Sequence, residues 1–116
     1  MQKISGGCHC GAVRFEADAD LAQPLQCNCS HCQIKGMIMA FIPEGAFRLV
    51  SGQERLSEYR FNKHVIAHQF CQVCGVQPFG FGTRPDGAKM AAINLRCVDG
   101  IEPDELSPRK FDGRKL

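Results

Sequence analysis

The sequence CNCSHC, residues 27–32, places three thiols within six residues, in the spacing C-x-C-x2-C with a histidine before the last cysteine. Seven of the eight cysteines lie in tight clusters of this kind, and only Cys97 stands alone. The other two clusters are the pairs Cys8/Cys10 and Cys71/Cys74. Packing in a hydrophobic core does not require cysteines to gather in this way, so the clusters indicate metal-binding chemistry.

The expected cell compartment favours metal ligands over disulfides. The N-terminal residues contain no apolar stretch of signal-peptide length, so we expect a cytoplasmic protein. In the reducing cytosol, clustered cysteines serve as metal ligands more often than as disulfides. A disulfide within a C-x-C pair such as Cys8/Cys10 would also be strained, because residues two apart rarely reach the required geometry.

The number of clustered cysteines predicts two metal sites of different kinds. Four-coordinate sulfur sites select zinc first, with iron as the competitor. A structural zinc needs four protein ligands, whereas a catalytic zinc usually has three and leaves one position for water or substrate. The cysteines divide naturally into four from the two pairs and three from the triplet Cys27, Cys29 and Cys32. Other partitions stay open: the triplet could lend a cysteine to a pair, or His31 or Cys97 could complete a second four-ligand site.

The histidines and the isolated cysteine have less specific interpretations. His31 is a loop residue that faces solvent, a hydrogen-bond partner of a ligand or sulfur, or a direct ligand. His64 and His68 share one face of an expected strand, and we expect them to be partly buried and hydrogen-bonded rather than metal-bound. Cys97 ends another expected strand, where a free cysteine usually acts as a small buried hydrophobe.

Short alternating segments predict a mostly β fold. Within residues 3–16, which are expected to form a strand, a metal knuckle and a second strand, Val13 and Phe15 alternate with polar neighbours. Further strands are expected at residues 37–42, 47–49, 56–61, 65–70, 79–82 and 90–97. No segment shows sustained helical spacing of apolar residues, so we expect at most one helical turn, near residues 104–106. Residues 1–116 are therefore expected to form a single domain of short hairpins.

The charge and hydropathy of the chain exclude two classes of partner. With seven thiolates and two divalent ions the formal charge changes from +2 to −1, which removes any bulk-charge argument for nucleic-acid binding. The chain also lacks the basic and aromatic stripe of a nucleic-acid-binding surface. No apolar run approaches the roughly 20 residues that a membrane helix needs. We expect neither a nucleic acid nor a membrane as partner.

Three motifs together resemble the glutathione-dependent formaldehyde-activating enzyme family, which includes the centromere protein V domain. They are GGCHCGAVRF at residues 6–15, CNCSHC at 27–32 and FCQVCG at 70–75. The segments INLRCVDG at residues 93–100 and FDG at 111–113 are also similar to that family. The resemblance spans nearly the whole chain in the same order, and the combination of three clusters is specific where one pair alone would be weak.

The resemblance implies a fold, two metal sites and an activity. The fold would be Mss4-like, with several short antiparallel strands in folded-over sheets and zinc knuckles. A structural zinc would be held by Cys8, Cys10, Cys71 and Cys74, and a second zinc by Cys27, Cys29 and Cys32. The activity would join glutathione and formaldehyde as S-(hydroxymethyl)glutathione, a carbon–sulfur lyase reaction in the reverse direction. The partners would be a small thiol such as glutathione and an aldehyde.

The chemistry of a three-cysteine zinc site favours binding of a thiol over activation of water. Each thiolate donates charge to the metal, so the ion is a weak Lewis acid but still accepts a soft fourth ligand. Four cations, Arg14, Lys35, Arg84 and Arg96, are available for the carboxylates of glutathione, although each is also interpretable as a solvated charge. The alternative to an enzyme is a non-catalytic zinc-binding module for a protein or small ligand.

Overall fold

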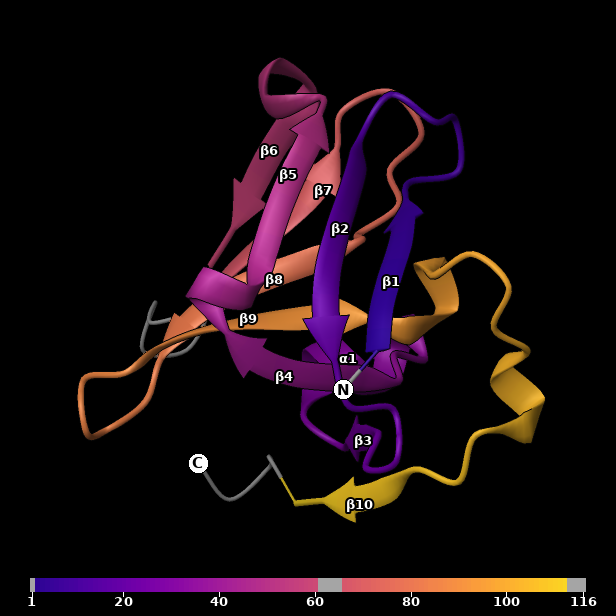
Figure 1. Cartoon of the computed structure of the whole chain (residues 1–116). Helices are drawn as coiled ribbons and strands as arrows, with labels where there is room; N and C mark the ends of the chain where they lie inside the picture. The colour runs from indigo at the N-terminus through magenta and orange to yellow at the C-terminus, as the bar shows by residue number, and fades with distance from the viewer. Residues whose placement is uncertain (1, 61–65, 113–116) are drawn as a thin grey trace.

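The protein is described here from a computed structural model, in which residues 2–60 and 66–112 are described (Figure 1). The described residues form a three-stranded sheet in the order β1-β2-β5 and a seven-stranded sheet in the order β10-β3-β4-β9-β8-β7-β6. All neighbouring strands are antiparallel except β10 and β3, which are parallel. The predicted fold class, mostly β with short antiparallel sheets, is confirmed.

The elements are short and follow one another closely. The strands are β1 (Gln2–Gly7), β2 (Arg14–Ala19), β3 (Leu25–Cys27), β4 (Met39–Pro43), β5 (Phe47–Ser51), β6 (Leu56–Tyr59), β7 (Ala67–Cys71), β8 (Phe79–Thr83), β9 (Lys89–Asn94) and β10 (Arg109–Phe111). The helices are α1 (Ser30–Lys35) and the 3₁₀ turns η1 (Glu44–Ala46), η2 (Gln53–Arg55), η3 (Leu95–Cys97) and η4 (Pro103–Glu105). None of the described helices is long and apolar enough to cross a membrane.

The N-terminal hairpin follows the alternation of its sequence. β1 and β2 pair from Gln2 opposite Ala19 to Gly7 opposite Arg14, and the first cysteine pair lies in the loop between them. Phe15 and every second residue after it in β2 is buried, while the residues between are partly exposed. The predicted sequence of strand, knuckle and strand is therefore confirmed.

Aromatic side chains join the two sheets. Phe15 of β2 packs edge-on against Phe79 of β8, with ring centroids 5.8 Å apart, and Phe47 of β5 lies 4.7 Å from the same ring. Phe15 and Phe79 are fully buried, and burial of one such side chain contributes about 1.5–3 kcal/mol. In Figure 1 the small sheet stands above β4 and β9, which run across its lower end.

The N-terminal hairpin also touches η3 at very close range. A Cβ atom added at Gly6 would lie 2.3 Å from the carbonyl oxygen of Cys97, a distance that no side chain tolerates. Gly6 also forms a bridge with Val98, and the Asp99 N–H donates to the Ser5 carbonyl. Glycine at this position therefore allows the backbone of the first sheet to contact the segment that follows β9.

The structure corrects three expectations about secondary structure. The triplet lies partly in a helix, α1, that the sequence pattern did not predict, because six residues are too few to show helical periodicity. The expected strand at residues 90–97 ends at Asn94, whose side chain accepts a hydrogen bond from the Arg96 N–H and caps η3. The strands β3 and β10 were not expected. The expected helical turn near residues 104–106 is present as η4.

Candidate metal centres

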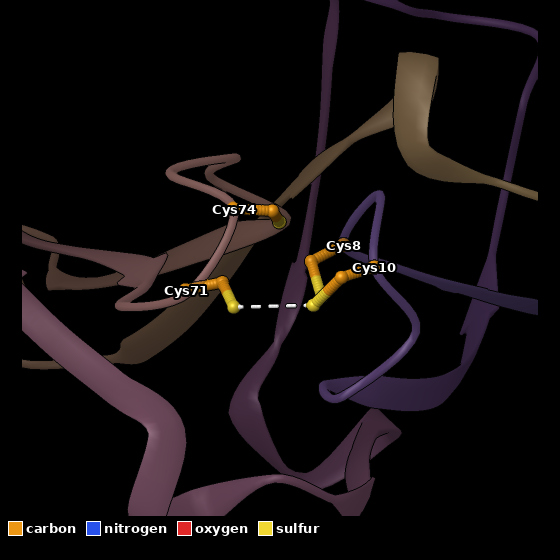
Figure 2. Close-up of side chains that lie close together, drawn as sticks. All are labelled: Cys8, Cys10, Cys71 and Cys74. Carbon is orange, nitrogen blue, oxygen red and sulfur yellow. Dashed lines mark hydrogen bonds between the residues drawn. The ribbon is translucent and has the colours of Figure 1, made fainter.

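The two cysteine pairs lie together although about sixty residues separate them. The four sulfur atoms of Cys8, Cys10, Cys71 and Cys74 all lie within 4.8 Å of one another. Cys8 and Cys10 lie on the loop after β1, whereas Cys71 ends β7 and Cys74 lies on the loop that follows. Figure 2 shows the Cys10 and Cys71 side chains facing each other. The cluster therefore links the small sheet to the large one.

The distances within this cluster fit a tetrahedral metal site. The Cys8 and Cys10 sulfurs are 3.6 Å apart, and the Cys10 and Cys71 sulfurs are 3.7 Å apart. A zinc–sulfur bond of about 2.3 Å gives a tetrahedral edge of about 3.8 Å. These two sulfur–sulfur distances are thus close to the spacing that a zinc ion requires.

In both loops a backbone N–H donates to sulfur and a glycine turns the chain after the second cysteine. The Val13 N–H donates to the Cys8 sulfur at 3.3 Å, and the Val73 N–H donates to the Cys71 sulfur at 3.4 Å. Gly11 and Gly75, which follow the second cysteine of each pair, have φ of 83° and 80°. This left-handed conformation turns the chain tightly and suits glycine.

The thiols of this cluster cannot all ionise without a cation. Hydrogen bonds from the backbone N–H groups of Val76 and Cys10 lower the pKa of Cys74 to about 6. The Ala12 N–H acts in the same direction on Cys10, but burial and the thiols of Cys8 and Cys71 outweigh it and raise the Cys10 pKa to about 11. Like charges this close repel each other, so only a bound cation would favour four thiolates.

The triplet forms a second cluster at the start of α1. The sulfurs of Cys27, Cys29 and Cys32 lie within 4.8 Å of one another. Cys27 ends β3, Cys29 caps the helix, and Cys32 lies in its first turn. The Cys29 N–H donates to the Cys27 sulfur and the Cys32 N–H donates to the Cys29 sulfur, each at 3.4 Å. At the other end, Gly36 has φ of 66° and its N–H donates to the carbonyls of Cys32 and Gln33.

The pKa values of Cys29 and Cys32 shift in opposite directions. Burial raises the pKa of Cys32, with the hydrogen bond to Cys29 adding to the effect. Burial acts in the same direction on Cys29, but hydrogen bonds from the Cys32 N–H and from neighbouring thiols lower its pKa overall. A soft cation would again be needed to hold all three as thiolates. The two clusters could therefore each bind a metal ion, and their sulfur donors are consistent with zinc.

His31 and Cys97 lie outside the two groups of sulfur atoms within the part of the chain that the structure describes. The His31 ring stacks on His68 of β7, with centroids 3.9 Å apart, and on Tyr59 of β6 at 5.8 Å. The Cys97 sulfur lies 3.8 Å from the Gln77 carbonyl oxygen, and burial raises its pKa to about 11. Neither residue supplies a fourth ligand to the triplet in this geometry.

His68 belongs to a polar network that the sequence did not reveal. Its Nδ1 lies 3.3 Å from the Gln77 amide nitrogen, and the Asn94 amide donates to the Gln77 carbonyl at 2.9 Å. Burial and then the nearby His31 lower the pKa of His68 to about 4. His68 is buried and in hydrogen-bond contact, as expected, whereas His64 lies outside the described residues.

A cavity of about 520 Å³ lies beside the triplet. Its wall includes two triplet cysteines, amide side chains and the last described strand: Gln26, Cys27, Asn28, Cys32, Gln33, Gly36, Lys110, Phe111 and Asp112. A volume of this size suits a small-molecule ligand. Sequence reasoning missed the charged residues of this wall, and the only signal that pointed to them was the similarity of residues 111–113 to the family.

The four cations considered from the sequence have other partners or positions. Arg14 pairs with Asp99, and Arg84 pairs with Asp86. The Arg96 guanidinium donates to the Gly36 carbonyl at 2.8 Å, so it braces the end of α1 instead of lining the cavity. Lys35 lies in the last turn of α1 and is not a lining residue either.

Comparison with known proteins supports the features above. The profile of the family described as "Glutathione-dependent formaldehyde-activating enzyme" matches residues 3–112. The fold is similar to a crystal structure of a Rhodobacter sphaeroides protein, a structural-genomics target, with a TM-score of 0.81 and 30% sequence identity. That similarity covers 92% of this chain and 99% of the other. Because the profile spans both cysteine clusters and nearly every described element, the chain belongs to the glutathione-dependent formaldehyde-activating enzyme family.

Proposed function

We propose that the protein is a zinc-dependent enzyme of the carbon–sulfur lyase type that acts on thiol–aldehyde adducts. In this proposal Cys8, Cys10, Cys71 and Cys74 hold a structural zinc. The triplet holds a second zinc, whose fourth position is open to a substrate thiol. The family implies glutathione and formaldehyde as the substrates, with S-(hydroxymethyl)glutathione as the adduct.

The observation that carries this proposal is the position of the triplet at the wall of a cavity. Cys27 and Cys32 both line it, and a metal held by them would lie within reach of a ligand there. The first cluster has four sulfurs, enough to close a tetrahedron without an added ligand. The difference in ligand number therefore supports a structural role for the first site and a substrate-binding role for the second.

The second zinc, when bound, would hold the substrate thiol as a thiolate at neutral pH. The protein's own residues would then orient the rest of the molecule. Gln26, Asn28 and Gln33 place amide donors and acceptors along the cavity, and Phe111 adds an apolar contact. In the synthetic direction the sulfur forms a bond to the aldehyde carbon. The carbonyl oxygen gains a proton as the thiol loses one, so the reaction is a balanced addition that gains mainly from positioning.

A non-catalytic binding module is the second candidate. Ile34 of α1 is 87% exposed and Val73, between the cysteines of the second pair, is 60% exposed. Apolar side chains beside both clusters could contact a partner. The cavity at the triplet favours the enzyme, because a module that binds through exposed residues has no need of it.

Metal analysis and exchange kinetics test the proposal. The purified protein should contain about two zinc ions per chain, and Cys29→Ser should lose one while the fold stays intact, since serine can still cap α1. Exchange NMR on zinc-loaded protein with glutathione and formaldehyde should then show adduct formation faster than the spontaneous reaction. Cys29→Ser should reduce the rate to that background.

Two outcomes would contradict the proposal. A fully zinc-loaded protein that gives no acceleration would exclude the formaldehyde reaction. Unfolding of Cys29→Ser would instead assign the triplet a structural role and favour the binding module.

A further inference from the structure

The last described strand forms one wall of the cavity beside the triplet. β10 pairs in parallel with β3, so that Phe111 lies opposite Cys27. The Arg109 N–H donates to the Pro24 carbonyl at 2.9 Å, and the Asn28 N–H donates to the Phe111 carbonyl at 3.1 Å. The backbone of β10 is therefore fixed at both ends, immediately beside a residue of the triplet.

Two charged side chains of this wall face the cavity. Lys110 and Asp112 are two residues apart, and both line it. The Lys110 ammonium donates to the Gln26 side-chain oxygen, and the Asp112 carboxylate accepts from the Asn28 amide at 3.0 Å. The two amide residues flank Cys27 in sequence. The charges of the wall are thus tied to the segment that carries the triplet.

The present partner of Lys110 is a neutral group, which a charged group of a ligand can displace. Its hydrogen-bond acceptor is a neutral amide oxygen, and no carboxylate of the described residues lies within 4.0 Å of its ammonium. In the bond to Gln26 only the donor is charged, whereas a carboxylate acceptor would add the attraction between two opposite charges. A carboxylate that enters the cavity would therefore compete well for Lys110.

We propose that Lys110 is a specificity-determining residue that selects thiols carrying a carboxylate, by pairing with that carboxylate while the thiol reaches the triplet. This inference rests on the proposed function, because it assumes that a thiol binds at the second metal. Asp112 complements Lys110 in the same wall, since its carboxylate accepts hydrogen bonds from N–H groups. The wall thus fits a ligand with both a carboxylate and N–H donors, such as an amino-acid or peptide thiol.

Isothermal titration calorimetry on the zinc-loaded full chain tests this role, with glutathione as the charged thiol and 2-mercaptoethanol as the uncharged one. Lys110→Gln should weaken glutathione binding by about tenfold, the size of one charge-assisted hydrogen bond at a partly exposed site. It should change 2-mercaptoethanol binding by less than about twofold. Arg109→Gln is the matched control, because it removes the same charge from β10 at a residue that does not line the cavity. It should leave both affinities unchanged.

The outcomes separate this inference from the function on which it rests. If Lys110→Gln weakens the binding of glutathione and of 2-mercaptoethanol equally, β10 only shapes the cavity. That result would overturn the specificity role of Lys110. If Arg109→Gln weakens glutathione binding as much as Lys110→Gln does, the effect comes from general charge attraction and not from a specific contact of Lys110. If wild-type protein binds neither thiol, the proposed function fails together with the inference. If it binds both and Lys110→Gln has no selective effect, only the inference fails.

Discussion

The two cysteine clusters contain the same donor atoms but close very different lengths of chain. In the first, Cys10 and Cys71 meet although they are 61 residues apart, and they join the β1–β2 loop of the small sheet to the end of β7 in the large one. In the second, the three cysteines lie within six residues at the start of one short helix. Closing a longer loop costs more chain entropy, by about 0.6 kcal/mol for each doubling of its length. We therefore expect the first cluster to stabilise the whole fold and the second to organise mainly its own segment.

Removal of a ligand from the first cluster should have the largest effect. Cys71 is fully buried, and Cys71→Ser would remove one of four sulfurs from the link between the sheets. Because the free energy of structural zinc binding is also folding free energy, we expect destabilisation by more than about 3 kcal/mol. Thermal and urea denaturation of the zinc-loaded variant measure this loss.

Cys97→Ser is the control for that substitution. The Cys97 sulfur donates to the Gln77 carbonyl oxygen, and a serine hydroxyl can keep this hydrogen bond. The control should stay within about 1 kcal/mol of the wild type. If Cys71→Ser and Cys97→Ser lose the same stability, any cysteine change in this region disturbs packing. The distinction between the two clusters would then lose its support.

Gly36→Ala should test how local the second cluster is. Gly36 ends α1 at φ of 66°, where alanine is strained by about 1 kcal/mol, although its Cβ would meet open space. We expect zinc affinity at the triplet to fall about fivefold while the unfolding temperature of the rest changes little. Competition with a chromophoric chelator measures the affinity.

Gly45→Ala provides the comparison for Gly36→Ala. Gly45 lies in η1, does not have a positive φ, and also has no atom within 4 Å of an added Cβ. Gly45→Ala should leave the zinc affinity of the triplet unchanged. A large fall in global stability for Gly36→Ala would indicate that the triplet segment, like the first cluster, supports the whole fold.

The burial of His68 should make the stability of the fold depend on pH. The pKa of His68 falls from 6.5 to about 4 on folding, because burial disfavours the charged ring. Below pH 6.5 the unfolded chain binds a proton that the folded chain does not, so stability falls as the pH decreases towards 4. Between pH 7.5 and pH 5.5 the free energy of unfolding should fall by about 1 kcal/mol.

Denaturation of zinc-loaded wild type and His68→Gln across that pH range measures the effect. Metal ligands titrate equally in both proteins, so the difference between them isolates His68. The stability of the variant should fall by about 1 kcal/mol less than that of the wild type. Parallel pH profiles would mean that His68 binds a proton equally well in both states.

The sequence predicted the features that depend on local pattern and missed those that depend on long-range pairing. The alternation around Phe15 and the repeated cysteine–glycine spacing predicted the hairpin and the two knuckles, because strands and turns have local signals. Helix α1 gave no periodic signal because it has only six residues and depends on its caps, Cys29 and Gly36. No spacing in the sequence indicates that His31 stacks on His68.

The wall of the cavity was the least predictable part. β3 and β10 have three residues each and pair across more than eighty positions in parallel. Strands this short have no alternation to recognise. Lys110 could not be identified as a cavity residue before that pairing placed it opposite Gln26, next to the triplet. The sequence pointed instead to cations that have other partners, such as Arg14.

X-ray absorption at the zinc edge can distinguish the two clusters most directly. Seven cysteine sulfurs shared by two zinc ions give an average of about 3.5 sulfur neighbours per zinc, and a thiol bound at the triplet raises this to about 4. In Cys29→Ser, which should keep only the four-sulfur site, the average should be about 4 with or without thiol. We predict that glutathione produces the increase in the wild type alone. An average that stays at 3.5 when the protein is saturated with glutathione would contradict an open zinc that binds the substrate thiol.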